Sequence, residues 1–193
     1  MRPRLQPRGR AVLGLCALLL AGLAVTTTAR PAALVRCGAI PSPEAALRRI
    51  NEARARGAMC HAAGAVTVAA PLNWSASLAA VAAAQAQDMA VLSRMGHRDR
   101  QDRGLAERLK AMGYRYSAAA ENVAVGYPTV DAVVDAWIDS AAHCDNLMST
   151  AVREIGLACV DGRSSGTITG DASDSPAEDR YWTLVLGAAR PSR

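Results

Sequence analysis

The chain has 193 residues, a formal net charge of +5 and 51% hydrophobic residues, without a single phenylalanine. Its first 29 residues contain four arginines and no acid, so the remaining 164 residues carry a net charge of only +1. This near-neutral balance gives no support for a nucleic-acid-binding protein, and we expect no nucleic-acid partner.

The N-terminus has the organisation of a secretory signal peptide. Residues 1–10 are basic, residues 11–25 are apolar and uncharged, and Thr27-Thr28-Ala29 provides a small-x-small ending. An uncleaved anchor needs about 20 apolar residues, more than this run offers. We therefore expect a signal peptide at 1–29, an extended lead-in at 30–42 and one domain at 43–190. The mature chain would be periplasmic or extracellular, with no transmembrane segment.

Four cysteines remain once the first 29 residues are removed. An even number in an exported chain favours two disulfides, and three pairings are possible. We expect Cys37–Cys60 and Cys144–Cys159, because each pair joins neighbours along the chain that flank one structural unit. A thiolate metal site is disfavoured because the sequence has no Cys-x-x-Cys pair.

Hydrophobic periodicity predicts helices in the first two thirds of the domain and strands at its end. The expected helices run over 43–57, 74–92, 104–112 and 129–138. The expected strands run over 154–160 and 181–186, with shorter ones at 122–127 and 167–169. Segregated helices and strands indicate an α+β fold rather than alternating βαβ units.

Three polar residues form the candidate site: His97, Glu121 and His143. Two imidazoles and a carboxylate are the ingredients of a metal site or an acid–base site. The alternative is a polar cluster that only ties the surrounding turns to the sheet. These residues belong to an ordered set of short motifs along the chain: Asn51-x-x-Arg54, Pro71-Leu72-x-Trp74, Asp88-Met89-Ala90, His97, Gly113-Tyr114, Glu121-Asn122-Val123-Ala124, Val133-Val134-x-x-Trp137, His143-x-x-Asn146-Leu147-Met148, Ile155-Gly156 and Tyr181-Trp182-Thr183.

This ordered set resembles the CAP superfamily, which comprises cysteine-rich secretory, antigen 5 and pathogenesis-related proteins and is also called SCP-like. The resemblance covers residues 45–187 and is strongest to the bacterial secreted branch. It implies a three-layer α-β-α sandwich with a central, mainly antiparallel sheet. It also implies a cleft with two histidines and two acids, which in some members binds a divalent metal, often zinc.

Residue by residue, the resemblance places His97, Glu121 and His143 in that cleft, together with Asn122, Asn146 and Asp139. The second cleft acid of eukaryotic members falls at Ser140, with Asp139 beside it, and Asp99 or Asp102 could take its place. Further departures are Ala120 for a glycine, Ala141-Ala142 for Pro-Gly, Leu184 for a glutamine and Leu186 for a phenylalanine.

The expected function is a secreted, monomeric CAP domain that binds an unknown envelope or extracellular ligand through its His/Glu cleft. A weakly bound divalent metal such as zinc could sit on His97 and His143, with Glu121 as a third ligand. No other cofactor is indicated. No nucleophile elbow or His-Glu-x-x-His helix occurs, so catalytic residues are unknown and a binding protein is favoured over an enzyme. The alternatives are a metal-dependent hydrolase and a lipid- or sterol-binding protein.

Overall fold

The structure is a computed structural model that describes residues 37, 43–60, 68–162 and 180–190. All of these residues lie in one compact unit, 33–193. The expected signal peptide, most of the lead-in and the short strand at 167–169 lie outside the described residues. Within those ranges, no helix is both long and apolar enough to cross a membrane.

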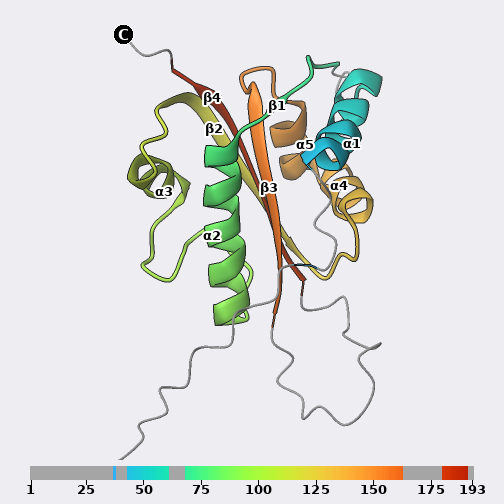
Figure 1. The fold of residues 1–193 in the computed structure, drawn as a ribbon. Helices are drawn as coiled ribbons and strands as arrows, with labels where there is room; N and C mark the ends of the chain where they lie inside the picture. The colour runs from blue at the N-terminus through green and yellow to red at the C-terminus, as the bar shows by residue number, and fades with distance from the viewer. Residues whose placement is uncertain (1–36, 38–42, 61–67, 163–179, 191–193) are drawn as a thin grey trace, which may run out of the picture. The chain divides into compact units, whose positions relative to one another are not determined.

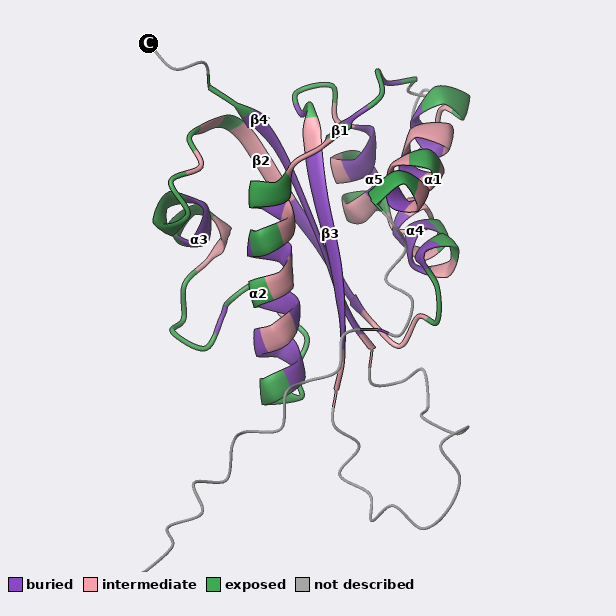
Figure 2. Ribbon diagram, viewed as in Figure 1, coloured by how far each residue is buried: buried purple, intermediate pink, exposed green. Residues whose placement is uncertain are grey.

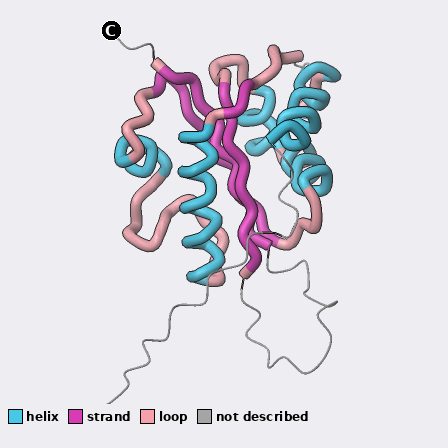
Figure 3. The backbone as a smooth tube through the Cα atoms, in the orientation of Figure 1, coloured by secondary structure: helices cyan, strands magenta, loops and turns pink. Residues whose placement is uncertain are grey.

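The described ranges contain a single mainly antiparallel sheet with the strand order β1-β3-β4-β2. Its central strands are β3 (Glu154–Asp161) and β4 (Arg180–Ala189), which pair antiparallel. The edge strand β2 (Tyr116–Val125) is antiparallel to β4, and the two-residue β1 (Asn73–Trp74) is parallel to β3. Figure 3 shows the strands running together through the centre of the unit.

Helices cover both faces of this sheet, which confirms the predicted α-β-α sandwich (Figure 1). On one face lie α2 (Ala76–Leu92) and the short α3 (Leu105–Ala111). On the other lie α1 (Pro43–Arg56), α4 (Val130–Ile138) and α5 (Ala141–Met148).

The two faces of the sheet bury separate hydrophobic clusters. Figure 2 shows the largely purple strands between helices that are partly buried. Leu184 and Leu186 of β4 pack with Trp137 in the cluster under α1, α4 and α5. Val185, between them in sequence, joins Leu78 in the cluster under α2. This alternation follows from the two-residue period of a strand. The tryptophans carry the volume that phenylalanine would otherwise supply.

Helix α2 packs directly on strand β3 because Gly156 has no side chain. A Cβ atom at this position would lie 1.9 Å from the backbone nitrogen of Ala79 and 2.2 Å from the carbonyl carbon of Leu78. Glycine is the residue that permits such a backbone approach. This close contact sets the distance between α2 and the sheet. It therefore also sets where the loop that carries His97 begins.

The sequence-based elements agree with the structure in type and differ at several ends. The helix expected from Trp74 begins at Ala76, because Asn73 and Trp74 pair with β3 and Ser75 caps the helix by accepting from the backbone of Leu78. Strand β2 begins at Tyr116 rather than Asn122. Helix α5 was not predicted, since its eight residues are too few for a clear periodic pattern.

The predicted disulfide pairing is wrong. The bonds join Cys37 to Cys159 and Cys60 to Cys144, with Cα atoms 5.5 and 5.3 Å apart. Cys37 and Cys159 belong to the large cluster under α1 and α4, whereas Cys60 and Cys144 pack in a separate small cluster with Met148. Neighbours along the chain therefore lie in different clusters, and the bonds form between residues that are close in space.

Candidate functional site

The loop that follows α2 carries His97 to the edge of the sheet. The helix ends at Leu92, and Ser93 adopts a left-handed conformation with φ of 47°. The buried side chain of Gln85 donates to the carbonyls of Gly96 at 2.7 Å and Arg98 at 3.4 Å. The backbone on both sides of His97 is thereby fixed to α2.

Glu121 of β2 is the buried centre of the site, with a side chain only 3% exposed. Nη2 of Arg108, from α3, donates to both of its carboxylate oxygens at 3.0 and 2.9 Å. The same nitrogen donates to the carbonyl of His97 at 3.2 Å. Arg108 is itself 4% exposed, so the pair forms a buried salt bridge that also holds the His97 loop.

The ring of His97 rests on this buried pair and faces solvent. Its Nδ1 lies 2.9 Å from Oε1 of Glu121, and its side chain is 59% exposed. A carboxylate accepts, so Nδ1 carries the proton and Nε2 points away with a free lone pair in the neutral ring. The hydrogen bond to Glu121 raises the pKa of His97, outweighing the burial that lowers it.

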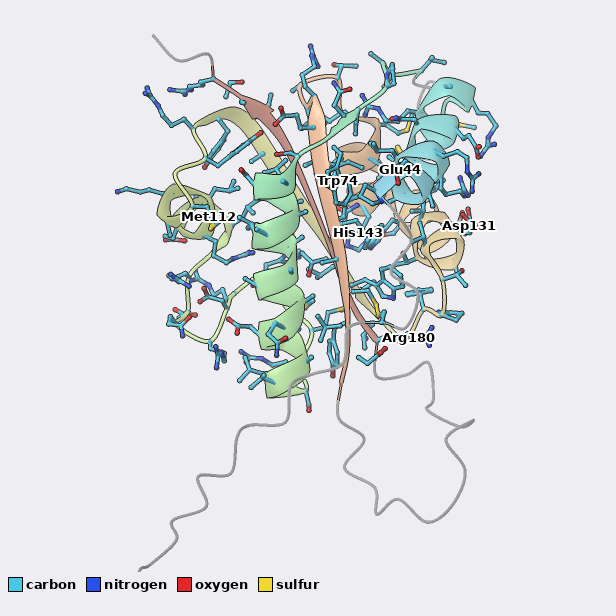
Figure 4. The ribbon with its side chains drawn as sticks, viewed as in Figure 1. Glu44, Trp74, Met112, Asp131, His143 and Arg180 are labelled. Atoms are coloured by element: carbon cyan, nitrogen blue, oxygen red, sulfur yellow. A yellow bond between two sulfur atoms is a disulfide. The ribbon has the colours of Figure 1, made fainter. Side chains whose placement is uncertain are left out.

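His143 approaches the same strand from the opposite layer, in the first turn of α5 (labelled in Figure 4). Its carbonyl accepts from Nδ2 of Asn122 at 3.0 Å, and Asn146 donates to Oδ1 of Asn122 at 2.8 Å. Asn146 also reaches the carbonyl of Glu121 at 3.4 Å. These amides bind α5 to β2 beside the Glu121 position.

The His143 ring has a hydroxyl partner rather than a carboxylate. Its Nδ1 lies 2.9 Å from Oγ of Ser140, the N-cap residue of α5. Burial lowers the pKa of His143, and the nearby charge of protonated His97 lowers it further. Protonation of His97 therefore opposes protonation of His143.

Most of the predicted site residues come together, and three acids do not. His97, Glu121, Asn122, His143 and Asn146 form one continuous set of contacts. Asp139 is the exposed C-cap residue of α4. Asp99 is buried against the guanidinium of Arg103, and Asp102 pairs with Arg98. Within the described part of the chain, none of these three carboxylates forms a hydrogen bond or ion pair with His97 or His143, whereas the Ser140 hydroxyl contacts the His143 ring.

Sequence reasoning missed Arg108, the residue that neutralises Glu121. Arg108 lies between Leu105 and Leu109 in the sequence, on the apolar face of α3. This position is the sequence feature that could have indicated a buried arginine. An arginine on an apolar helix face needs an acidic partner, because burying its charge alone is costly. The atoms Nε and Nη1 of Arg108 are buried without a hydrogen-bond partner among the described residues.

The donor set can be compared with the needs of a divalent metal. No group of three or more His, Cys, Asp or Glu side chains suited to a metal occurs among the residues that the structure describes. Both oxygens of Glu121 are already engaged by Arg108 and His97. The free donors are thus the Nε2 atoms of the two histidines, with Glu121 orienting His97 through Nδ1, a role common in metal sites.

Comparison with known proteins gives one family and one curated relative. The model of the cysteine-rich secretory protein family, CAP, matches residues 47–185. An uncharacterized Bacillus subtilis protein, YkwD, is 31% identical over 97 residues, which are 50% of this chain and 38% of that protein. The chain thus spans well under half of the length of this relative.

The similar solved structures have low sequence identity to this chain. An outer surface protein from Borrelia burgdorferi superimposes with a TM-score of 0.50 at 18% identity, over 62% of this chain and 78% of that one. An extracellular SCP-domain protein from Bacillus anthracis gives 0.49 at 21% identity, over 62% and 34%. A cysteine-rich secretory protein from Staphylococcus aureus gives 0.48 at 18% identity, over 77% and 40%.

Proposed function

Because the chain belongs to the cysteine-rich secretory protein (CAP) family, we propose that it is an exported binding module whose paired histidines hold a ligand. Export is supported by the signal-peptide pattern of residues 1–29 and by two disulfides, which form in oxidising compartments. The ligand would be a component of the cell envelope or of the extracellular medium.

One observation carries this proposal: Glu121 has both oxygens taken, while the ring it supports is open to solvent. A general base must reach the substrate proton that it takes, and both oxygens of the buried Glu121 carboxylate already accept hydrogen bonds from Arg108 and His97. The same contacts fix the tautomer and direction of His97. The geometry therefore suits presentation of two imidazole nitrogens to a bound molecule better than acid–base work by Glu121.

A divalent metal, zinc by preference, is the simplest ligand that two imidazole Nε2 atoms could take. When bound, it would supply a Lewis-acid centre open to further ligands. With two protein donors rather than three or four, we propose weak and reversible binding. Glu121 and Ser140 would then hold the rings through their Nδ1 atoms.

Zinc titration of the mature chain by calorimetry tests this proposal. We expect one weak site in the wild type, lost in both His97→Ala and His143→Ala. The third histidine of the chain, His61, provides a matched control, and His61→Ala should bind as the wild type does. Unchanged binding in the two site variants would refute the metal part.

Pulldown from envelope extracts tests the wider binding role independently of zinc. Wild-type protein and the His97→Ala variant are immobilised in the presence of a chelator, and retained molecules are identified by mass spectrometry. We expect a component that the variant loses. If every retained component is also held by His97→Ala, the paired histidines are not the binding site.

A hydrolase is the second candidate, and one contact favours it. The Ser140 hydroxyl lies 2.9 Å from His143, whose lowered pKa keeps the ring neutral and able to accept a proton near pH 7. Turnover of ester, peptide or glycan substrates with and without Zn²⁺ would support this candidate if it vanished in Ser140→Ala. Activity that survives in Ser140→Ala would exclude Ser140 as its nucleophile.

A further inference from the structure

A pocket lies away from the histidines, where α3 meets the ends of β2 and β4. Its volume is about 520 Å³, and it shares no lining residue with the His97–Glu121–His143 site. Met112, labelled in Figure 4, marks the end of α3, where the chain turns into the pocket through Gly113. Gly113 has φ of +70°, a conformation that glycine adopts without strain.

Two tyrosines that pack against the cluster under α2 line this pocket. Tyr114 and Tyr116 have ring centroids 6.5 Å apart, with an angle of 18° between the ring planes. Both rings are half-buried, and the Tyr114 hydroxyl donates to the Glu154 carboxylate at 2.8 Å. The absence of a side chain at Gly187 makes room for this hydroxyl, which a Cβ there would approach to 2.7 Å. The result is a fixed platform of two near-parallel, stacked aromatic rings.

Three cations surround the platform without an acidic partner. Lys110, Arg115 and Arg190 line the pocket and are exposed, and none forms an ion pair within the described ranges. The backbone N–H of Arg190 donates to the carbonyl of Arg115 at 2.9 Å, so the two arginine side chains leave neighbouring positions of the backbone. Three cations against the single carboxylate of Glu107 leave the pocket lining with a net positive charge, which attracts anions.

The acid in the pocket is already committed to a structural role. Oε2 of Glu107 accepts from the backbone N–H of Gly104 at 2.7 Å, where it completes the N-terminal cap of α3. The pocket thus combines three free cations with one carboxylate used elsewhere, in a chain whose mature part is nearly neutral. The positive charge is local, which is expected of a site for an anionic ligand.

We propose that this pocket binds an acidic glycan, with one sugar ring on the Tyr114–Tyr116 platform and its carboxylates or phosphates on Lys110, Arg115 and Arg190. Pockets of this size hold a small ligand through apolar and aromatic surface plus a few placed polar groups. Arginine forks match planar carboxylate and tetrahedral phosphate groups through two parallel hydrogen bonds.

The geometry favours a glycan over a membrane or a nucleic acid. A membrane-binding face needs a broad set of protruding apolar side chains, whereas the pocket lining offers two half-buried tyrosines, one alanine and charged side chains. A nucleic-acid strand needs a row of phosphate contacts along a basic stripe, whereas these cations gather round one pocket. Anionic vesicles and single-stranded DNA therefore serve as discriminating ligands in the test.

Binding of an oligogalacturonate, measured by calorimetry at low and high salt, tests the proposal. We expect saturable binding that weakens with salt, about tenfold weaker binding for Arg115→Gln/Arg190→Gln, and a similar loss for Tyr116→Ala. A neutral oligosaccharide of equal length should not compete. Arg94→Gln and Arg98→Gln remove exposed charges outside the pocket, and their combination is the matched control, expected to change affinity less than twofold.

Several results would overturn this assignment. They are the absence of oligogalacturonate binding at millimolar concentration, equal losses in the pocket and control variants, and equal or tighter binding of anionic vesicles or single-stranded DNA. Thermal unfolding of each variant identifies any that fails to fold. Because the assay uses no metal and His97→Ala should bind the oligogalacturonate normally, its outcome is independent of the histidine site.

Discussion

Arg108 places a single guanidinium nitrogen between the two oxygens of Glu121 and the carbonyl of His97. One side chain of the short helix α3 therefore neutralises the buried carboxylate and positions the loop that carries the exposed imidazole. The stability of this part of the fold and the geometry of the site depend on the same contact.

Replacing Arg108 should destabilise the protein strongly. Arg108→Met leaves Glu121 as an uncompensated buried charge, and we expect a loss of about 3–5 kcal/mol in the free energy of unfolding. Urea denaturation at pH 7 measures it. Arg98→Met removes an exposed arginine paired with Asp102 and should cost less than about 1 kcal/mol.

The double variant Arg108→Met/Glu121→Gln separates charge from packing. It removes both charges, so most of the loss in Arg108→Met should be recovered. If the double variant is as unstable as the sum of the two single variants, the Arg108–Glu121 pair is not the cause of the loss.

The two histidines should titrate on opposite sides of the usual value of about 6.5. The Glu121 hydrogen bond raises the pKa of His97, while burial lowers that of His143. Imidazole proton shifts measured by NMR give both midpoints. Glu121→Gln should lower the His97 midpoint, and His97→Ala should raise the His143 midpoint toward 6.5. Midpoints that coincide in the wild type would contradict the geometry.

The raised pKa of His97 also predicts a pH-dependent contribution to stability. A raised pKa in the folded state means that the folded chain holds the proton more tightly than the unfolded chain does. The stabilisation is fully present below about pH 6.5 and is lost as the pH rises through the folded-state pKa. The stability difference between wild type and His97→Ala should therefore shrink from pH 5.5 to pH 8, though solvent screening of the exposed ring keeps it small.

Local patterns allowed the main helices and strands to be predicted, whereas the three layers and the placing of His97, Glu121 and His143 in one site came from the resemblance to the CAP family. The helix at α4 is set by the spacing of Val130, Val133, Val134 and Trp137, whose buried side chains share one face. Contacts between residues far apart in the sequence could not be predicted from such local patterns. The partner of Arg108, like the partners of the cysteines, depends on which elements become neighbours in space, and spacing along one chain does not encode that.

The disulfide connectivity gives a direct test of these neighbours. Digestion without reduction, followed by mass spectrometry, should recover the peptide of Cys37 joined to that of Cys159, and Cys60 joined to Cys144. The bonds close segments of 122 and 84 residues, so replacing either pair by alanine should cost about 2–5 kcal/mol. A peptide that joins Cys37 to Cys60 would show that the small cluster around Cys144 is assembled differently.

Gly156→Ala should be among the most damaging single-methyl additions to the domain. The new Cβ would meet the backbone of α2 at 1.9 Å, and a helix backbone cannot move aside as a flexible side chain can. We expect a loss of about 3 kcal/mol or more in unfolding free energy, measured by denaturation. Gly96→Ala is the matched control, because its Cβ would meet nothing within 4 Å, and it should change stability by about 0.5 kcal/mol or less. If Gly156→Ala were equally mild, α2 would have to lie farther from β3, and the loop that begins at its C-terminus could not hold His97 against Glu121.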